Sequence, residues 1–163
     1  MATEIERKFL IKNESWRQKI QRSVPMRQAY LANTAQASIR IRIAKDVAHL
    51  NIKSAVSAIV RDEYEYQIPM DDAEEMFMQL CLPGRISKTR HYVEHSDEIW
   101  EIDEFHDENA GLIVAEIELN EAKQAFPRPS WLGAEVSHLE RYYNHLLINM
   151  PYGRWSDITR REV

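Results

Sequence analysis

The segment TEIERKFLI, residues 3–11, alternates charged and apolar residues and places Glu4, Glu6 and Lys8 on one parity. Because successive side chains of a β-strand point to opposite faces, these three charged groups share one face of a predicted strand. Period-two alternation recurs along the chain and predicts eight strands. The predicted strands are Glu4–Ile11, Arg27–Leu31, Ser38–Ala44, Val47–Ser54, Val60–Ile68, Arg85–His95, Ile99–Phe105 and Leu112–Leu119.

Three further segments are predicted to be helical. Asp71–Leu82 begins with two acidic residues and ends at a Pro-Gly pair, and Glu121–Phe126 is stopped by a proline. Val136–Ile148 carries apolar residues at helical spacing, with Ser137 as its N-cap. The predicted class is therefore α+β, with a sheet and a few helices.

The last residues, 149–163, have no clear period, and Trp155 is the one visible anchor. This tail is expected either to dock or to fray. Neither a linker nor an internal repeat divides the sequence. Residues 1–163 are therefore expected to form a single domain with a peripheral tail.

Within the predicted strands, one parity collects like-charged residues at positions i and i+2. Like charges at that distance are unfavourable unless an opposite charge lies between or across from them. Carboxylate pairs suit divalent cations, and arginine or lysine pairs suit phosphate oxygens. A sheet that displays both kinds predicts a ligand that combines an anion with a metal ion. The alternative is the solvated face of an amphipathic sheet, which is the common arrangement for a single antiparallel strand.

Eight antiparallel strands can close into a barrel, and a charged parity that points inward would give it a polar lumen. Buried charge is retained at a cost in stability, so such a lumen would indicate a function. Its eight acids and seven bases nearly balance: Glu4, Glu6, Glu63, Glu65, Glu101, Asp103, Glu116 and Glu118 with Lys8, Arg40, Arg42, Lys53, Arg61, Lys88 and Arg90.

Composition and charge exclude several classes of protein. A chain of 163 residues that is 44% hydrophobic and 29% charged can bury its own core. The net charge of −5 argues against undirected nucleic-acid binding. Neither a long apolar run nor a secretory signal is visible, so no membrane association is expected. Cys81 is the only cysteine, which excludes an internal disulfide and favours a reducing, cytoplasmic location.

The Glu4-x-Glu6-x-Lys8 pattern resembles the signature of the CYTH superfamily, the triphosphate tunnel metalloenzymes. The resemblance extends over about residues 3–148, because the charged doublets follow in the same order as in that family. The matching segments are RIRI (Arg40, Arg42), NIK (Lys53), EYEY (Glu63, Glu65), KTR (Lys88, Arg90), WEID (Glu101, Asp103), AEIEL (Glu116, Glu118) and the C-terminal segment with Arg141, Tyr142 and Asn144.

This resemblance implies an eight-stranded antiparallel barrel whose tunnel binds a triphosphate with one or two Mg²⁺ or Mn²⁺ ions. It implies that the phosphates are held by Lys8, Arg40, Arg42, Lys53, Lys88 and Arg90, and the metal by Glu4, Glu6, Glu116, Glu118 and Asp103. Arg61 joins the phosphate-binding set by parity. Glu63, Glu65 and Glu101 would orient the basic residues or ligate a second metal ion, and Arg141 and Tyr30 would close the tunnel. Glu4, Glu6 and Lys8 are the candidate catalytic residues, with Glu6 as the acceptor of a proton from water.

Three classes of function fit such a tunnel. The favoured one is hydrolysis of a small triphosphate, above all inorganic tripolyphosphate, with thiamine or nucleoside triphosphates as alternatives. A class IV adenylyl cyclase and a non-catalytic polyphosphate- or nucleotide-binding module stay open. The expected partner is thus a small-molecule triphosphate, and a homodimer is plausible because the walls of a barrel leave apolar surface.

Overall fold

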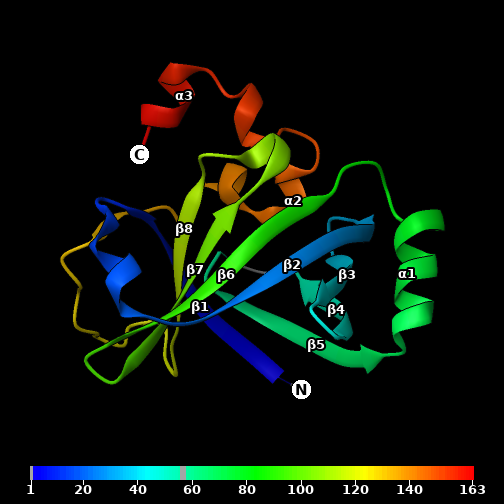
Figure 1. Cartoon of the computed structure of the whole chain (residues 1–163), viewed down its shortest axis with the longest axis horizontal. Coiled ribbons are helices and arrows are strands. Elements are labelled where there is room, and N and C mark those ends of the chain that lie inside the picture. Colours follow the sequence, from blue (N-terminus) through cyan, green and yellow to red (C-terminus); the bar gives the residue numbers. More distant parts are fainter. Residues whose placement is uncertain (1, 56–57) are drawn as a thin grey trace.

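Residues 2–55 and 58–163 are described by the computed structural model, in which a long antiparallel sheet curls into a barrel (Figure 1). The strand order is β5-β4-β3-β2-β6-β7-β8-β1-β9, and an additional pairing of β5 with β1 closes the ring. The predicted eight-stranded barrel is therefore confirmed, with β9 added beside β1. The strands are β1 Ala2–Ile11, β2 Ile20–Asn33, β3 Ala37–Ala44, β4 Val47–Ser54, β5 Val60–Ile68, β6 Ile86–His95, β7 Glu98–Phe105, β8 Ile113–Glu118 and β9 Leu132–Glu135.

Strand β1 closes the barrel because its two halves pair with different neighbours. Its first half, Ala2–Ile5, lies opposite Val60–Glu63 of β5. Its second half lies opposite β8, where Glu6 faces Glu118 and Lys8 faces Glu116. The ExExK segment thus joins the two edges of the sheet, and its charged parity points into the enclosed space.

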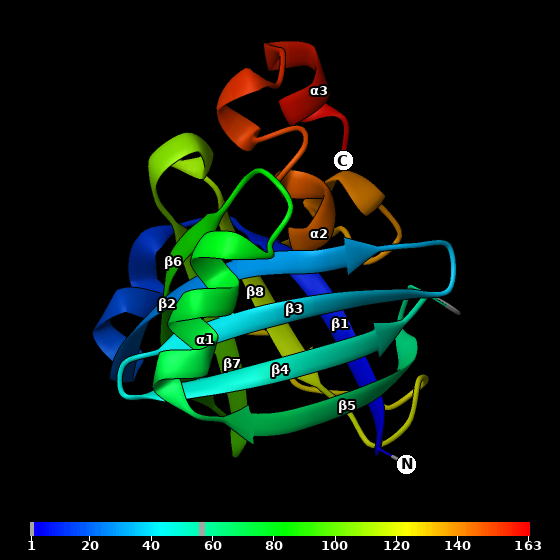
Figure 2. The same ribbon diagram turned by 90° about the vertical axis from the view of Figure 1, so that its right-hand side faces the viewer.

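The apolar parity forms the outer wall, which is covered from several sides. Helix α1 (Met70–Gln79) buries Ala73 and Phe77 against Ile41 and Ile43 of β3, and Figure 2 shows this helix lying across β3 and β4. A second apolar cluster surrounds Trp100 on the opposite side of the barrel. The core of this protein therefore lies outside the barrel, between its wall and the covering segments.

Two of the predicted helices are wrong. Residues 121–126 form a turn followed by irregular chain. The segment 136–148 contains only the 3₁₀ turn η3 (Glu140–Tyr142) and the short helix α2 (Asn144–Leu147). The Val136 N–H donates to the Lys8 carbonyl at 2.8 Å and the Lys8 N–H donates to Ser137 Oγ at 2.9 Å, so these residues are bonded to β1 instead of starting a helix.

Other differences concern lengths and short elements. The predicted strand Arg27–Leu31 is only the end of β2, which already pairs with β6 at Ile20, and Pro25 within it obscures the strand pattern. The helix predicted over Asp71–Leu82 is confirmed as α1, which begins at Met70 and ends at Gln79, three residues earlier than predicted. The short elements that the sequence did not indicate are η1 (Glu14–Lys19), η2 (Asp107–Asn109), η4 (Tyr152–Arg154) and α3 (Asp157–Arg161).

The tail docks through its tryptophan. Trp155 is 7% exposed and packs edge-on against Tyr142 and Tyr152, with ring centroids 5.1 Å apart in both pairs. Its indole N–H donates to the Met150 carbonyl at 3.0 Å. No helix in residues 2–55 or 58–163 has the length and hydropathy needed to cross a membrane.

Trp100 is the best point at which to test the outer-wall packing, because its fully buried ring contacts Phe9, Phe126 and Trp131 edge-on. Replacing Trp100 by Ala should lower the free energy of unfolding by about 3–5 kcal/mol, as expected for an emptied aromatic site. Urea denaturation measures this, with the adjacent exposed Ile99→Ala as a control that should change stability by about 0.5 kcal/mol or less. A Trp100→Ala protein as stable as this control would contradict the packing described.

Candidate active site

The barrel encloses a cavity of 460 Å³ whose wall is dominated by charged side chains. They come from β1, β3, β4, β5, β6, β7 and β8. Charged side chains from all of these strands therefore line the same cavity. The charged parity therefore faces inward, away from bulk water. The charged lining residues are Glu4, Glu6, Lys8, Arg40, Arg42, Lys53, Arg61, Glu63, Glu65, Arg90, Glu101, Glu116 and Glu118.

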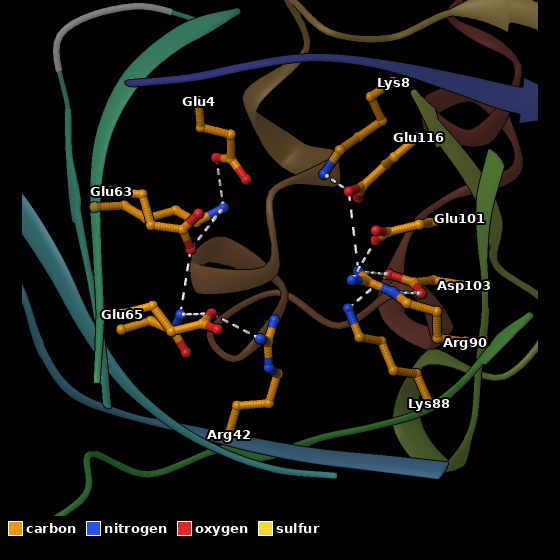
Figure 3. Close-up of polar contacts among 12 residues, drawn as sticks. Glu4, Lys8, Arg42, Glu63, Glu65, Lys88, Arg90, Glu101, Asp103 and Glu116 are labelled. Atoms are coloured by element: carbon orange, nitrogen blue, oxygen red, sulfur yellow. Dashed lines mark hydrogen bonds and ion pairs between the residues drawn. The ribbon is translucent and has the colours of Figure 1, made fainter. Parts of the chain in front are cut away.

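On one side of the cavity, carboxylates and bases from β1, β3, β4 and β5 are paired with one another (Figure 3). Lys53 Nζ lies 2.7 Å from Glu4 Oε2 and 3.7 Å from Glu63 Oε1. Arg42 donates to Glu65 Oε2 at 2.9 Å. These pairs link β1, β4, β5 and β3, so the predicted supporting role of Glu63 and Glu65 has a geometric basis.

On the other side, Arg90 is held by three acidic residues. Its guanidinium donates to both oxygens of Asp103, at 2.8 and 2.9 Å, and forms ion pairs with Glu101 and, at 4.0 Å, with Glu116. Lys88 Nζ also donates to Asp103, at 2.6 Å. This network fixes the orientation of Arg90 towards the cavity (Figure 3).

Lys88 and Asp103 do not line the cavity, in contrast to the prediction. Both side chains have no exposed surface. Because Lys88 and Arg90 engage both carboxylate oxygens of Asp103, that residue orients bases instead of facing a metal site. Burial lowers the pKa of Lys88 to about 8, despite the opposing charge of Asp103.

The carboxyl groups of Glu6 and Glu118 lie close to other carboxylates of the cavity wall. Burial, followed by the charges of Glu116 and Glu4, holds the pKa of Glu6 well above its usual range. Burial and the charges of Glu4 and Glu63 raise the pKa of Glu118 as well. A divalent cation beside these groups would relieve the repulsion, so this donor set suits a hard cation.

The carboxylates of the cavity wall are not arranged around a metal ion in this structure. Within residues 2–55 and 58–163, no group of three acidic, histidine or cysteine side chains is arranged to hold a metal. Glu4 is paired with Lys53, and Glu116 lies 3.2 Å from Lys8 Nζ. Cation binding would therefore require these two carboxylates to exchange their lysine partners for the metal.

The arginines show the complementary excess of positive charge. Burial and the neighbouring Arg40 and Arg90 lower the pKa of Arg42. In the described part of the chain, the buried Nε atoms of both Arg40 and Arg42 lack a hydrogen-bond partner. Arginine side chains that line a cavity and keep unsatisfied donors suit the oxygens of a polyanion.

Two residues were predicted to close the tunnel, and the structure places only one of them there. Tyr30 lines the cavity and is 2% exposed. Arg141 lies outside the lining, where its guanidinium packs near the rings of Tyr142 and Trp155 and donates to the Glu162 carbonyl. The cause is the irregular path of the segment after β9, which turns Arg141 towards the docked tail.

Sequence reasoning missed five polar or aromatic lining residues, among them Asn144. Ser38 comes from β3, and Ser137, Tyr143 and His145 come from the segment that was predicted to be a helix. Tyr143 lies within the segment predicted as the helix Val136–Ile148, and its ring centroid is 4.7 Å from the Arg61 guanidinium. Ser38 shares the parity of Arg40 and Arg42 on β3, so alternation could have identified it. No sequence signal identifies the others, because their direction depends on the non-helical path of the segment.

Comparison with known proteins agrees with this architecture. The model of the CYTH domain matches residues 2–145. A curated "inorganic triphosphatase" of Acetivibrio thermocellus is 36% identical over 157 residues, covering 96% of this chain and all of that protein. An "inorganic triphosphatase" of Nitrosomonas europaea is 34% identical over 149 residues, covering 89% of this chain and 96% of that protein.

A solved structure resembles this chain in both fold and sequence. The crystal structure of the inorganic triphosphatase NE1496 superposes with a TM-score of 0.63 at 32% identity, and covers 91% of this chain and 95% of that one. The family match spans most of the chain and the relatives align nearly end to end. The enclosed ionic cavity, the ExExK strand that closes the barrel and these likenesses lead to one conclusion: the chain belongs to the CYTH family.

Proposed function

We propose that this chain hydrolyses inorganic tripolyphosphate to diphosphate and phosphate within the barrel cavity, with Mg²⁺ or Mn²⁺ as cofactor. The observation that carries the proposal is the enclosed wall on which unpartnered arginine donors lie beside crowded carboxyl groups. The names of the two curated relatives support the same activity and substrate.

Substrate binding would rest on the basic lining residues. Arg40 and Arg42 offer free Nε donors, and Arg90 is already oriented by Asp103. Lys8 and Lys53, now paired with Glu116 and Glu4, would turn to phosphate oxygens once those carboxylates bind a cation. The exchange keeps every charge compensated, and this matters because unpaired buried charge is costly.

The carboxylates of Glu4, Glu6, Glu116 and Glu118 would hold the metal. Bound there, a divalent cation offsets phosphate charge and lowers the pKa of a water molecule. Attack of water on a terminal phosphorus breaks one P–O–P bond and releases diphosphate. Glu6, a carboxylate that lines the cavity, would accept the proton of the water.

Four inferences from the sequence remain predictions. Arg61 stays a predicted phosphate ligand, the single domain over residues 1–163 and the cytoplasmic location stay predictions, and so does the absence of a nucleic-acid partner. The predicted homodimer has a surface available, because Tyr64 and Tyr66 on the outer face of β5 are 38% and 56% exposed.

Arg42 tests the role of the cavity in substrate binding. Replacing Arg42 by Ala should lower kcat/KM for tripolyphosphate by about 100-fold or more, because it removes a desolvated charged donor. Phosphate release measures this loss. Arg27→Ala is the matched control, because Arg27 forms an exposed ion pair with Glu74 beside α1 and should leave the rate unchanged. Equal rates for the two variants would rule out Arg42 as a substrate ligand.

Glu118 tests the metal site. Removing divalent cations with a chelator should abolish phosphate release, and Mg²⁺ or Mn²⁺ should restore it. Replacing Glu118 by Gln should raise the metal concentration needed for half-maximal activity by about 10-fold or more, since a carboxylate ligand is lost. Glu94→Gln, at an exposed position near the end of β6 that does not line the cavity, should titrate like the wild type. Full activity in chelator would refute the metal requirement.

A panel of substrates separates the competing functions. Tripolyphosphate should be cleaved with a higher kcat/KM than ATP or thiamine triphosphate, and ATP should yield no cyclic AMP. Formation of cyclic AMP would instead identify a cyclase. Binding of tripolyphosphate without release of phosphate would identify a binding module.

A further inference from the structure

A second cavity, of 260 Å³, lies apart from the barrel cavity and is bordered by the docked tail. It is lined by residues 10–14, residues 111–113 and three side chains of the C-terminal segment, Tyr142, Tyr152 and Arg160. We call it the tail pocket, and Figures 1 and 2 show the tail beyond one end of the barrel. None of the described residues lines both this pocket and the barrel cavity. The tail pocket is therefore a separate candidate site.

Two cationic side chains line the tail pocket without an acidic partner. Lys12 follows the end of β1, and Arg160 belongs to α3. Within residues 2–55 and 58–163, no carboxylate lies at ion-pair distance from either of them. The acidic residue of the lining, Glu14, already forms an ion pair with Arg17. The lining of the pocket thus carries an excess of positive charge.

The guanidinium of Arg160 is held in place and keeps a free donor. Its Nη2 donates to the Tyr152 carbonyl at 3.0 Å, and its central carbon lies 4.6 Å from the centroid of the Tyr152 ring. Tyr152 is itself fixed, because its N–H donates to Oδ1 of the buried Asn109 at 2.9 Å. In the described part of the chain, the buried Nε of Arg160 has no hydrogen-bond partner. A cation that is already oriented loses little conformational freedom when it binds an anion.

The size and the chemistry of the tail pocket restrict its ligand. A volume of 260 Å³ is smaller than the roughly 300–1,000 Å³ of sites for drug-sized molecules, so the ligand is small. A guanidinium matches the paired oxygens of a carboxylate or phosphate group, and a lysine adds a point charge. The rings of Tyr142 and Tyr152 form the less polar part of the lining. They displace water beside the cations, which strengthens attraction to an anion.

We propose that the tail pocket is a binding site for a small oxyanion, of the phosphate or carboxylate class, held by Arg160 and Lys12. The site is distinct from the barrel cavity and does not depend on the proposed function. A bound oxyanion would bridge the end of β1 to α3, because Lys12 and Arg160 come from these two parts of the chain. Binding would therefore also strengthen docking of the tail.

The test is an NMR titration of the full ¹⁵N-labelled chain with inorganic phosphate and, separately, with acetate. The indole N–H of Trp155 is the reporter, because its ring packs against Tyr142 and Tyr152 of the pocket, with centroids 5.1 Å apart in both pairs. Trp155→Phe identifies this signal. We expect a saturable shift with at least one of the two anions, and the anion that produces it identifies the class of ligand. Chloride at the same ionic strength should give no saturable shift, because it only screens charge.

Three variants locate the bound anion. Arg160→Ala should raise the dissociation constant by about 10-fold or more, because it removes a charged hydrogen-bond donor. Lys12→Ala should raise it as well, and this variant keeps the contacts of Arg160 that help to hold the tail. Arg161→Ala is the matched control, because Arg161 is exposed in the same helix and does not line the pocket. This control should bind like the wild type.

Arg42→Ala separates this site from the barrel cavity, which phosphate is also expected to enter. The response of Trp155 should persist in this variant. A response that disappears in Arg42→Ala but persists in Lys12→Ala would place the anion in the barrel and overturn the inference. The absence of a saturable response to both anions, or an unchanged dissociation constant in Lys12→Ala, would overturn it too. None of these results bears on tripolyphosphate hydrolysis, so the two proposals fail independently.

Discussion

Closure of the sheet by β1 is the constraint on which the rest of the structure depends. Residues 2–5 of this strand pair with β5 and residues 6–10 pair with β8, so a single strand joins both edges. Closure forces the alternating charges of Glu4, Glu6 and Lys8 to the inside, where they meet the charged parity of the other strands. An open sheet would leave the same side chains in water, where ion pairs contribute little.

Enclosure turns a balanced set of charges into a site with local imbalance. Glu4 and Glu116 have lysine partners, whereas burial, followed by the charges of neighbouring carboxylates, raises the pKa values of Glu6 and Glu118. On the basic side, the Arg42 guanidinium is crowded by other arginines. A polyanion together with a cation satisfies both excesses at once, so the arrangement favours a ligand with both components. Buried charge lowers the stability of the ligand-free protein, and ligand binding would restore part of that loss.

The fold could be predicted from alternation because period two is a strong local signal, and eight strands follow from it. Alternation alone cannot tell which parity faces inward, since this depends on closure; the family resemblance supplied that direction. Alternation also does not predict how deeply each side chain is buried. Lys88 and Asp103 share the inward parity, yet they are buried in the wall, where they hold Arg90. The predicted helix over residues 136–148 was wrong because apolar residues at helical spacing also fit an irregular segment that packs one side on a barrel. Tyr143 and His145 at the end of the cavity consequently escaped notice.

The most direct test of the central claim is a crystal structure of the protein with tripolyphosphate and Mn²⁺, in which anomalous scattering locates the metal. The account predicts manganese beside the carboxylates of Glu6 and Glu118, and phosphate oxygens on the Nε atoms of Arg40 and Arg42 inside the barrel. Tripolyphosphate bound on the outer surface, or manganese remote from these carboxylates, would contradict it.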